Sequence, residues 1–124
     1  MKKFASTALR PLLRRMFRPY LGHVMKPAAR VVPVGLRSAD GTALEGALLH
    51  PENGRGVVVF CHPLLKYGYH YFLHNGLARW AAEAGLHAVL FNFQGIGRSA
   101  LGGLRFADDV VGVVGWARER FPGL

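Results

Sequence analysis

The sequence has few of the features that define several large classes of protein. Its single cysteine, Cys61, excludes an intrachain disulfide and fits a reducing compartment such as the cytoplasm. No apolar run reaches the roughly 18 residues of a membrane-spanning helix. Low-complexity tracts and internal repeats are also missing. The 51% hydrophobic content is typical of a small globular domain.

Acidic residues are missing from the first 30 positions. Residues 1–30 hold eight of the 16 Lys and Arg residues, whereas the other eight are nearly balanced by all seven acidic residues. The net charge of +9 therefore belongs to an N-terminal arm, and the body is almost neutral. A nearly neutral body argues against nucleic acid as a partner.

The arm is open to several interpretations. Arg14 and Arg15 interrupt the apolar region that a secretory signal needs. They resemble a twin-arginine signal, but Arg18 and Pro19 follow where apolar residues belong. The composition also fits a transit peptide, a solvated extension, or an amphipathic helical arm on an anionic membrane surface.

The central part of the chain reads as strand, helix, strand. Apolar runs at Val57–Cys61 and Ala88–Phe93 flank a segment that ends at Gly85 and has apolar residues at helical spacing, namely Leu77, Trp80, Ala81 and Ala84. This pattern predicts two buried parallel strands joined by a helix, with Cys61 buried and unreactive. Ligands bind beyond the carboxyl ends of such strands, which directs attention to the loops after Cys61 and Phe93.

The flanking segments complete a mixed α/β pattern. Residues 31–38 and 42–49 surround Asp40-Gly41, a hairpin signal, and Pro33 suits an edge strand. Near the C-terminus, apolar residues from Phe106 to Phe121 recur at helical spacing. Within that predicted helix, Gly112 and Gly115 lower the intrinsic helix propensity and would permit close packing on the sheet.

Two motifs carry a family resemblance. His62-Pro63-Leu64 follows the first apolar run, and Asn92 to Ser99 reads Asn-Phe-Gln-Gly-Ile-Gly-Arg-Ser. The chain from Val31 to Leu124 resembles the N-terminal half of an α/β-hydrolase, whose fourth strand ends in a pattern close to Asp-Phe-Arg-Gly-x-Gly-x-Ser. The resemblance implies an antiparallel strand pair, then β-α-β-α with parallel strands. A domain at 31–124, preceded by the arm at 1–30, would lack the nucleophile elbow G-x-S-x-G and all that follows it.

The resemblance also implies roles for individual residues. The loop after the third strand supplies one oxyanion-hole N–H, and because Pro63 has no N–H, that donor is assigned to Leu64. His62 would support the loop and not act as the base. The alternative is an ordinary strand-ending turn. Tyr67 and Tyr69 would line an ester or acyl pocket or pack in the core.

No convincing nucleophile or metal site is present in the sequence. Ser99 lies in Gly-Arg-Ser-Ala-Leu, which departs from G-x-S-x-G, so we expect it to shape a turn. His70 and His74 are four residues apart but lack the HExxH glutamate, and Gly95-Ile96-Gly97 lacks the third Gly of a nucleotide loop. We therefore predict no metal and no cofactor.

The resemblance implies a serine hydrolase acting on ester, thioester or peptide bonds. Because the catalytic Ser, Asp and His are missing from these 124 residues, we expect a fragment without turnover. The alternative is a non-catalytic module that is membrane-associated or completed by a partner. In either case Val57–Cys61 would form an open sheet edge, through which the chain would oligomerise.

Overall fold

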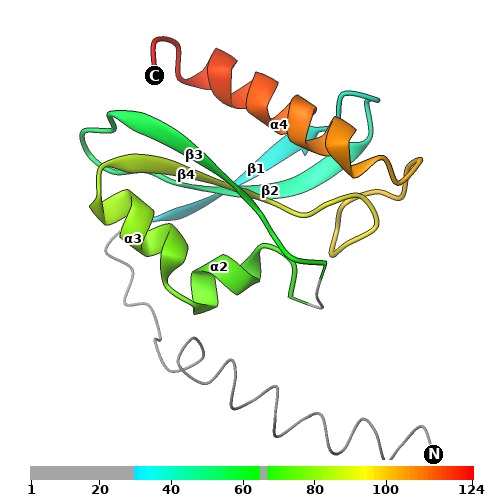
Figure 1. The fold of residues 1–124 in the computed structure, drawn as a ribbon, viewed down its shortest axis with the longest axis horizontal. Helices are drawn as coiled ribbons and strands as arrows, with labels where there is room; N and C mark the ends of the chain where they lie inside the picture. Colours follow the sequence, from blue (N-terminus) through cyan, green and yellow to red (C-terminus); the bar gives the residue numbers. More distant parts are fainter. Residues whose placement is uncertain (1–29, 65–66) are drawn as a thin grey trace, which may run out of the picture.

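The computed structural model describes residues 30–64 and 67–124, drawn in colour in Figure 1. The interpretations of the basic arm concern residues that lie almost entirely outside these ranges. The elements are β1 (Val31–Arg37), β2 (Ala43–Leu49), β3 (Gly56–Cys61), α2 (His70–His74), α3 (Leu77–Glu83), β4 (Leu86–Phe91) and α4 (Phe106–Arg120). No helix in the described ranges is long and apolar enough to cross a membrane.

The four strands form one mixed sheet in the order β1-β2-β4-β3. β1 pairs with β2, and β2 with β4, in antiparallel fashion, whereas β3 and β4 are parallel. This arrangement confirms the predicted antiparallel pair followed by a strand-helix-strand unit. Within the described residues β3 is an edge strand, so one side of its backbone has no neighbouring strand.

The hairpin between β1 and β2 forms for local reasons. Gly41 has φ of +89°, a conformation that glycine adopts without steric cost. The Thr42 N–H donates to Asp40 Oδ1 over 2.9 Å, and the Gly41 N–H donates to the Ser38 carbonyl over 2.9 Å. As predicted, Pro33 lies on an edge strand of the sheet that the described residues form, a position where proline is tolerated.

Helices cover both faces of the sheet, with α4 on one side and α2 and α3 on the other (Figure 1). Side chains alternate along β4, so that Val89 and Phe91 pack toward α4 and Ala88 and Leu90 toward α2 and α3. All four are fully buried. A strand buried on both faces requires a continuous apolar run. The apolar run in the sequence therefore predicted β4.

The expectation that Cys61 is buried was wrong, and α3 packs on the sheet through residues other than its largest apolar one. Trp80 is 68% exposed, because α3 packs on the sheet through small side chains, namely Ala78, Ala81 and Ala82. Cys61 is exposed at the end of the edge strand β3, although nearby apolar atoms still raise the pKa of its thiol through partial desolvation. The apolar run and the helical spacing identified both elements, but the apolar run misplaced the side chain of Cys61.

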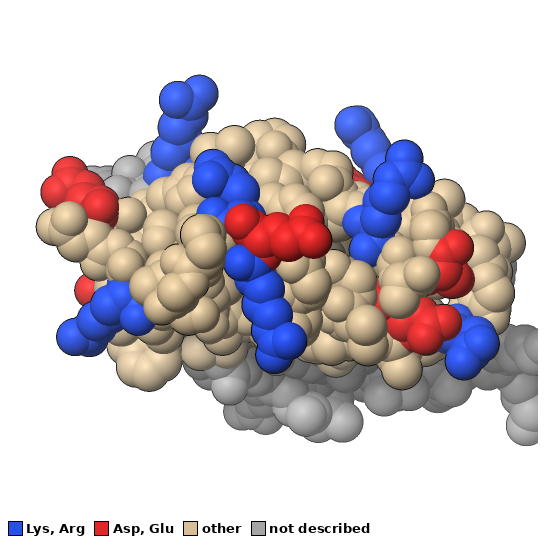
Figure 2. Space-filling view, turned by 90° about the horizontal axis from the view of Figure 1, so that it is seen from above, with Lys and Arg blue, Asp and Glu red and all other residues tan. Residues whose placement is uncertain are grey.

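Charged side chains on the α4 face are of mixed sign. Seen from above, arginine side chains are interspersed with aspartate and glutamate, and no continuous patch of one sign covers the described part of this face (Figure 2). The mixed surface agrees with the nearly neutral composition beyond residue 30.

Candidate functional site

The loops that follow β3 and β4 lie side by side. Cys61 at the end of β3 pairs with Phe91 at the end of β4, so parallel pairing brings the next residues of both strands to one edge of the sheet. This is the edge at which ligands bind in parallel sheets. The two motifs that carried the family resemblance therefore form one site.

His62 is a buried side chain that connects the two loops. Its Nε2 accepts a hydrogen bond from the Phe93 N–H over 3.2 Å, and its Nδ1 lies 2.7 Å from the Pro63 carbonyl. In the neutral ring, acceptance at Nε2 places the hydrogen on Nδ1, which donates to that carbonyl. The ring also packs edge-on against Phe93 at 5.0 Å. Both ring nitrogens are therefore engaged with backbone groups.

Asn92 forms hydrogen bonds to Tyr69, which follows the same loop, and to Glu45 on β2. Its Oδ1 accepts a hydrogen bond from the Tyr69 N–H over 2.8 Å. Its Nδ2 donates to Glu45 Oε2 over 2.8 Å, and this oxygen also accepts the Arg98 N–H over 2.8 Å. His62 and Tyr69 are thus hydrogen-bonded to the consecutive residues Phe93 and Asn92.

Two glycines let both loops approach Asn92. A Cβ on Gly68 would lie 2.1 Å from Asn92 Oδ1, and a Cβ on Gly97 would lie 2.5 Å from Asn92 Nδ2. Both glycines also have positive φ, +51° and +56°, where other residues are strained. Close contact and backbone conformation therefore both require glycine at these positions.

Leu64 lies two residues after His62 and has an exposed side chain. Within the described ranges the structure gives its N–H no hydrogen-bond acceptor. That state is compatible with the predicted oxyanion donor, because a donor already bonded to protein would be unavailable to substrate. The oxyanion role of Leu64, and the supporting role of His62 in it, stay predictions.

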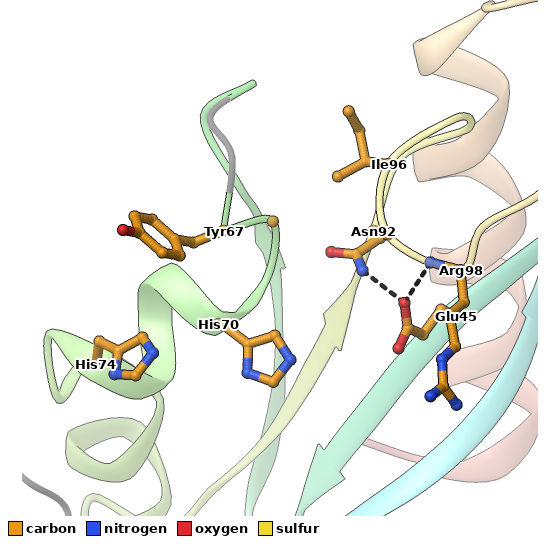
Figure 3. A pocket seen from close by; sticks show the side chains of 9 residues that line it. Glu45, Tyr67, His70, His74, Asn92, Ile96 and Arg98 are labelled. Carbon is orange, nitrogen blue, oxygen red and sulfur yellow. Dashed lines mark hydrogen bonds between the residues drawn. The ribbon is translucent and has the colours of Figure 1, made fainter.

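A pocket of about 340 Å³ opens between this loop and the loop after β4. Figure 3 shows Tyr67, His70 and His74 on one wall and Asn92, Ile96 and Arg98 on the other, with Glu45 beside them. Tyr67 is one of the residues that line this pocket, and its role in an ester or acyl pocket stays a prediction. Tyr69 instead packs in the core beneath α2, and this burial raises the pKa of its hydroxyl.

Ser99 shapes the turn after β4, as predicted. Its hydroxyl donates to the Asn92 carbonyl over 2.7 Å and accepts the Glu45 N–H over 2.9 Å. The residue is only 7% exposed. Because the hydroxyl is bonded in both directions and shielded, it is unsuited to attack a substrate.

A buried polar cluster behind the site was missed by sequence reasoning. Asp109 is fully buried and accepts hydrogen bonds from the Gln94 N–H over 2.9 Å and from Gln94 Nε2 over 2.7 Å. Gln94 Nε2 also donates to Asp40 Oδ2 over 3.0 Å, and hydrogen bonds, chiefly from Thr42, lower the pKa of Asp40 to about 2. In the sequence, Asp109 was indistinguishable from an ordinary acidic residue in a first helical turn.

Histidines elsewhere form close pairs without a metal-binding arrangement. His70 and His74 lie on α2 with ring centroids 6.4 Å apart. Away from the site, the Nδ1 atoms of His50 and His87 are 3.1 Å apart. No group of three or more His, Cys, Asp or Glu residues in the described ranges is placed to hold a metal ion.

Comparison with known proteins identifies the fold. No family model and no curated protein sequence matches the chain. Among solved structures it is similar to a lidless α/β serine hydrolase of Xanthomonas campestris, with a TM-score of 0.62, 27% identity, and coverage of 81% of this chain and 49% of that one. It is also similar to an esterase of Pyrococcus furiosus, with a TM-score of 0.62, 16% identity, and coverage of 77% of this chain and 37% of that one. For an α/β serine hydrolase homologue of Coxiella burnetii the TM-score is 0.51 and the identity 23%, with coverage of 80% of this chain and 49% of that one.

The described residues therefore have the fold of the N-terminal part of an α/β-hydrolase, as the two motifs predicted. The chain spans less than half the length of each of these three structures.

Proposed function

We propose that the loops after β3 and β4 form the oxyanion-loop side of a hydrolase that cleaves an ester, thioester or peptide bond. The observation that carries this proposal is the exposed Leu64, whose N–H has no acceptor in the described residues and which lies two residues after the buried, hydrogen-bonded His62. A donor held in place before substrate arrives stabilises developing negative charge without reorganisation.

In this proposal His62 positions the loop and takes no part in proton transfer. Nδ1 is engaged with the Pro63 carbonyl and Nε2 with the Phe93 N–H, so no ring nitrogen is available to accept a proton from a nucleophile. The second oxyanion donor would be the N–H of the residue after the nucleophile.

The nucleophile, base and orienting acid would come from polypeptide beyond the described residues. Ser99 is excluded by its two hydrogen bonds. The β3 edge, which has no partner in the described ranges, would pair with a further parallel strand that ends in G-x-S-x-G. Its run Gly56–Cys61 has no charge or proline, the devices that normally block edge pairing. Side chains of β3 already pack on both faces of the sheet.

The first test is to read the coding DNA on both sides of these 124 codons in all frames. A strand ending in G-x-S-x-G, followed by an Asp and a His, is the expected result. In the longer product, Leu64→Pro removes the N–H, and we expect kcat for p-nitrophenyl esters to fall about 10²- to 10³-fold. Leu64→Ala keeps the N–H and is the matched control, with kcat expected to change little.

Two results would contradict the proposal. One is the lack of any such motif in the flanking DNA. The other is ester turnover by the 124-residue chain that Ser99→Ala abolishes, because it would make Ser99 the nucleophile. Far-UV circular dichroism of both Leu64 variants separates loss of the donor from loss of the fold.

A further inference from the structure

The pocket between α2 and the β4 loop contains two opposite charges that do not pair with each other. Glu45 uses one carboxylate oxygen, Oε2, for hydrogen bonds to Asn92 and to the Arg98 N–H. The other carboxylate oxygen of Glu45 has no hydrogen-bond or ion-pair partner in the described part of the chain. The Arg98 guanidinium has none there either. Both residues line the pocket and extend along the same wall (Figure 3).

The wall opposite is aromatic and carries further hydrogen-bonding groups. His70 stacks on Tyr69 with ring centroids 4.5 Å apart, which holds its imidazole in place. His74 and Tyr67 complete this wall, and their rings meet edge-on at 6.3 Å. Ile96 contributes an aliphatic side chain from the β4 loop. The pocket thus combines one anion, one cation and an apolar part.

The chemistry of this lining selects among ligands. A simple anion would face the Glu45 carboxylate, and a simple cation would face the Arg98 guanidinium, so each would meet repulsion as well as attraction. A metal ion is disfavoured, because no group of three ligating residues in the described ranges is suitably placed. A ligand with both charges satisfies both side chains. The volume of about 340 Å³ is at the small end of ligand pockets, which start at about 300 Å³.

We propose that this pocket binds a small zwitterion of the α-amino-acid type with an apolar side chain. Its ammonium group would contact the free carboxylate oxygen of Glu45, and its carboxylate would contact the Arg98 guanidinium. Tyr67 and Ile96 would contact its apolar side chain. The proposal does not depend on hydrolase activity, because it concerns binding by residues present in this chain.

The experiment is calorimetric titration of the 124-residue chain with three probes that share the leucine side chain and differ in which charged groups they keep. L-Leucine carries both charges, L-leucinamide only the ammonium, and N-acetyl-L-leucine only the carboxylate. We expect saturable binding of leucine and affinities at least about 10-fold lower for the other two, as expected for the loss of one charge-assisted contact.

Substitution of Arg98 makes the test specific. Arg98→Gln is expected to weaken leucine binding about 10-fold and to leave leucinamide binding unchanged or stronger. Because the Arg98 side chain is exposed and only its N–H bonds to Glu45, the fold should persist, which circular dichroism checks. Arg118→Gln, on the exposed side of α4, is the matched control and should bind leucine as the parent does.

The proposal is overturned if the three probes bind equally, if Arg98→Gln leaves leucine affinity unchanged, or if leucine shows no saturable binding. Each of these outcomes concerns the pocket alone. The Leu64 variants of the longer product measure turnover, so the two proposals succeed or fail separately.

Discussion

Asn92 occupies the position where the α/β-hydrolase pattern has Asp, and its surroundings explain the difference. Its Oδ1 accepts the Tyr69 N–H, which an aspartate oxygen would do equally well. Its Nδ2 donates to Glu45 Oε2 over 2.8 Å, which an aspartate cannot do. Here the carboxylate comes from Glu45 on β2, so an amide is needed directly after β4 to connect that carboxylate to the loop after β3.

This arrangement predicts that Asn92→Asp is destabilising. The change places two carboxylates within hydrogen-bond distance of each other, and we expect the free energy of unfolding to fall by about 2–4 kcal/mol at neutral pH, since a partly buried hydrogen bond becomes a repulsion. Acidification should reduce the penalty, because a proton shared between the carboxylates removes the repulsion. Urea denaturation at neutral and acidic pH measures both effects.

The control for this prediction is the double variant Asn92→Asp with Glu45→Gln. It returns a donor to the pair, so most of the lost stability should be recovered at neutral pH. An Asn92→Asp protein as stable as the parent at neutral pH would show that the Asn92–Glu45 hydrogen bond contributes little.

Among the elements, helix α4 contains two glycines, Gly112 and Gly115, that differ in how closely other backbone approaches them. A Cβ on Gly112 would lie 2.1 Å from the Arg37 carbonyl oxygen and 2.8 Å from the Ala39 nitrogen, whereas a Cβ on Gly115 would meet nothing within 4 Å. The Ala39 N–H donates to the Asp108 carbonyl in the same helix over 2.9 Å. Gly112 therefore permits α4 to contact the β1–β2 hairpin, and Gly115 has no such role.

The two glycines predict opposite responses to alanine. Gly112→Ala should destabilise the protein by about 1–3 kcal/mol, because rigid backbone must shift. Gly115→Ala should stabilise it by about 1 kcal/mol, because alanine has the higher helix propensity at an exposed position. Thermal and urea denaturation of the pair test this directly, and equal effects of the two substitutions would contradict the packing of α4.

Helix α3 shows the limit of periodicity for a short element. The spacing of Leu77, Trp80, Ala81 and Ala84 predicted the helix, yet Trp80 is exposed and Ala78 is fully buried. Small side chains let α3 lie close to the sheet, and the larger apolar residues on other faces remain in solvent. Hydrophobicity alone does not distinguish these faces in a helix of seven residues.

At the scale of the whole molecule, the end of the domain opposite the site carries a group sensitive to pH. His50 Nδ1 lies 3.1 Å from His87 Nδ1, and His87 stacks on Phe121 at 4.2 Å. This joins β2, β4 and the end of α4. Burial, followed by the charge of Arg120, lowers the pKa of His50. The pKa of His87 is also lowered, mainly by burial and then by the nearby His50 and Arg120.

These shifts predict that stability falls on mild acidification. Both histidines have a lower pKa when folded than the ordinary value of 6.5, so the unfolded chain binds more protons below that pH. Their contribution is therefore fully present above about pH 6.5 and is lost as the pH falls through the folded pKa values. Urea denaturation at pH 7.5 and at successively lower pH measures the decrease.

The control is the double variant His50→Gln with His87→Gln, whose stability should decrease less over the same pH range. An unchanged decrease would show that other groups cause it. Asp40, with its pKa lowered to about 2, acts in a different range. Its contribution is present above its ordinary pKa of 3.8 and is lost as the pH falls toward 2.

The four strands, α3 and α4, and their order, were predictable from the sequence, whereas the short helix α2 was not predicted. The hairpin followed from Asp40-Gly41, the buried β4 from its apolar run, and α4 from its spacing and terminal charges, because each depends on contacts within a few residues. The position of the site also followed, since parallel strands place their carboxyl ends at one edge.

Which side chains meet at that edge depended on the packing of distant segments and was not predictable from the sequence. Glu45 and Asn92 are 47 residues apart, Gln94 and Asp109 are separated by a loop and a helix terminus, and Cys61 proved exposed. The sequence pattern reports whether a residue is polar or apolar. Partners, burial and free hydrogen-bonding groups depend instead on how distant segments pack.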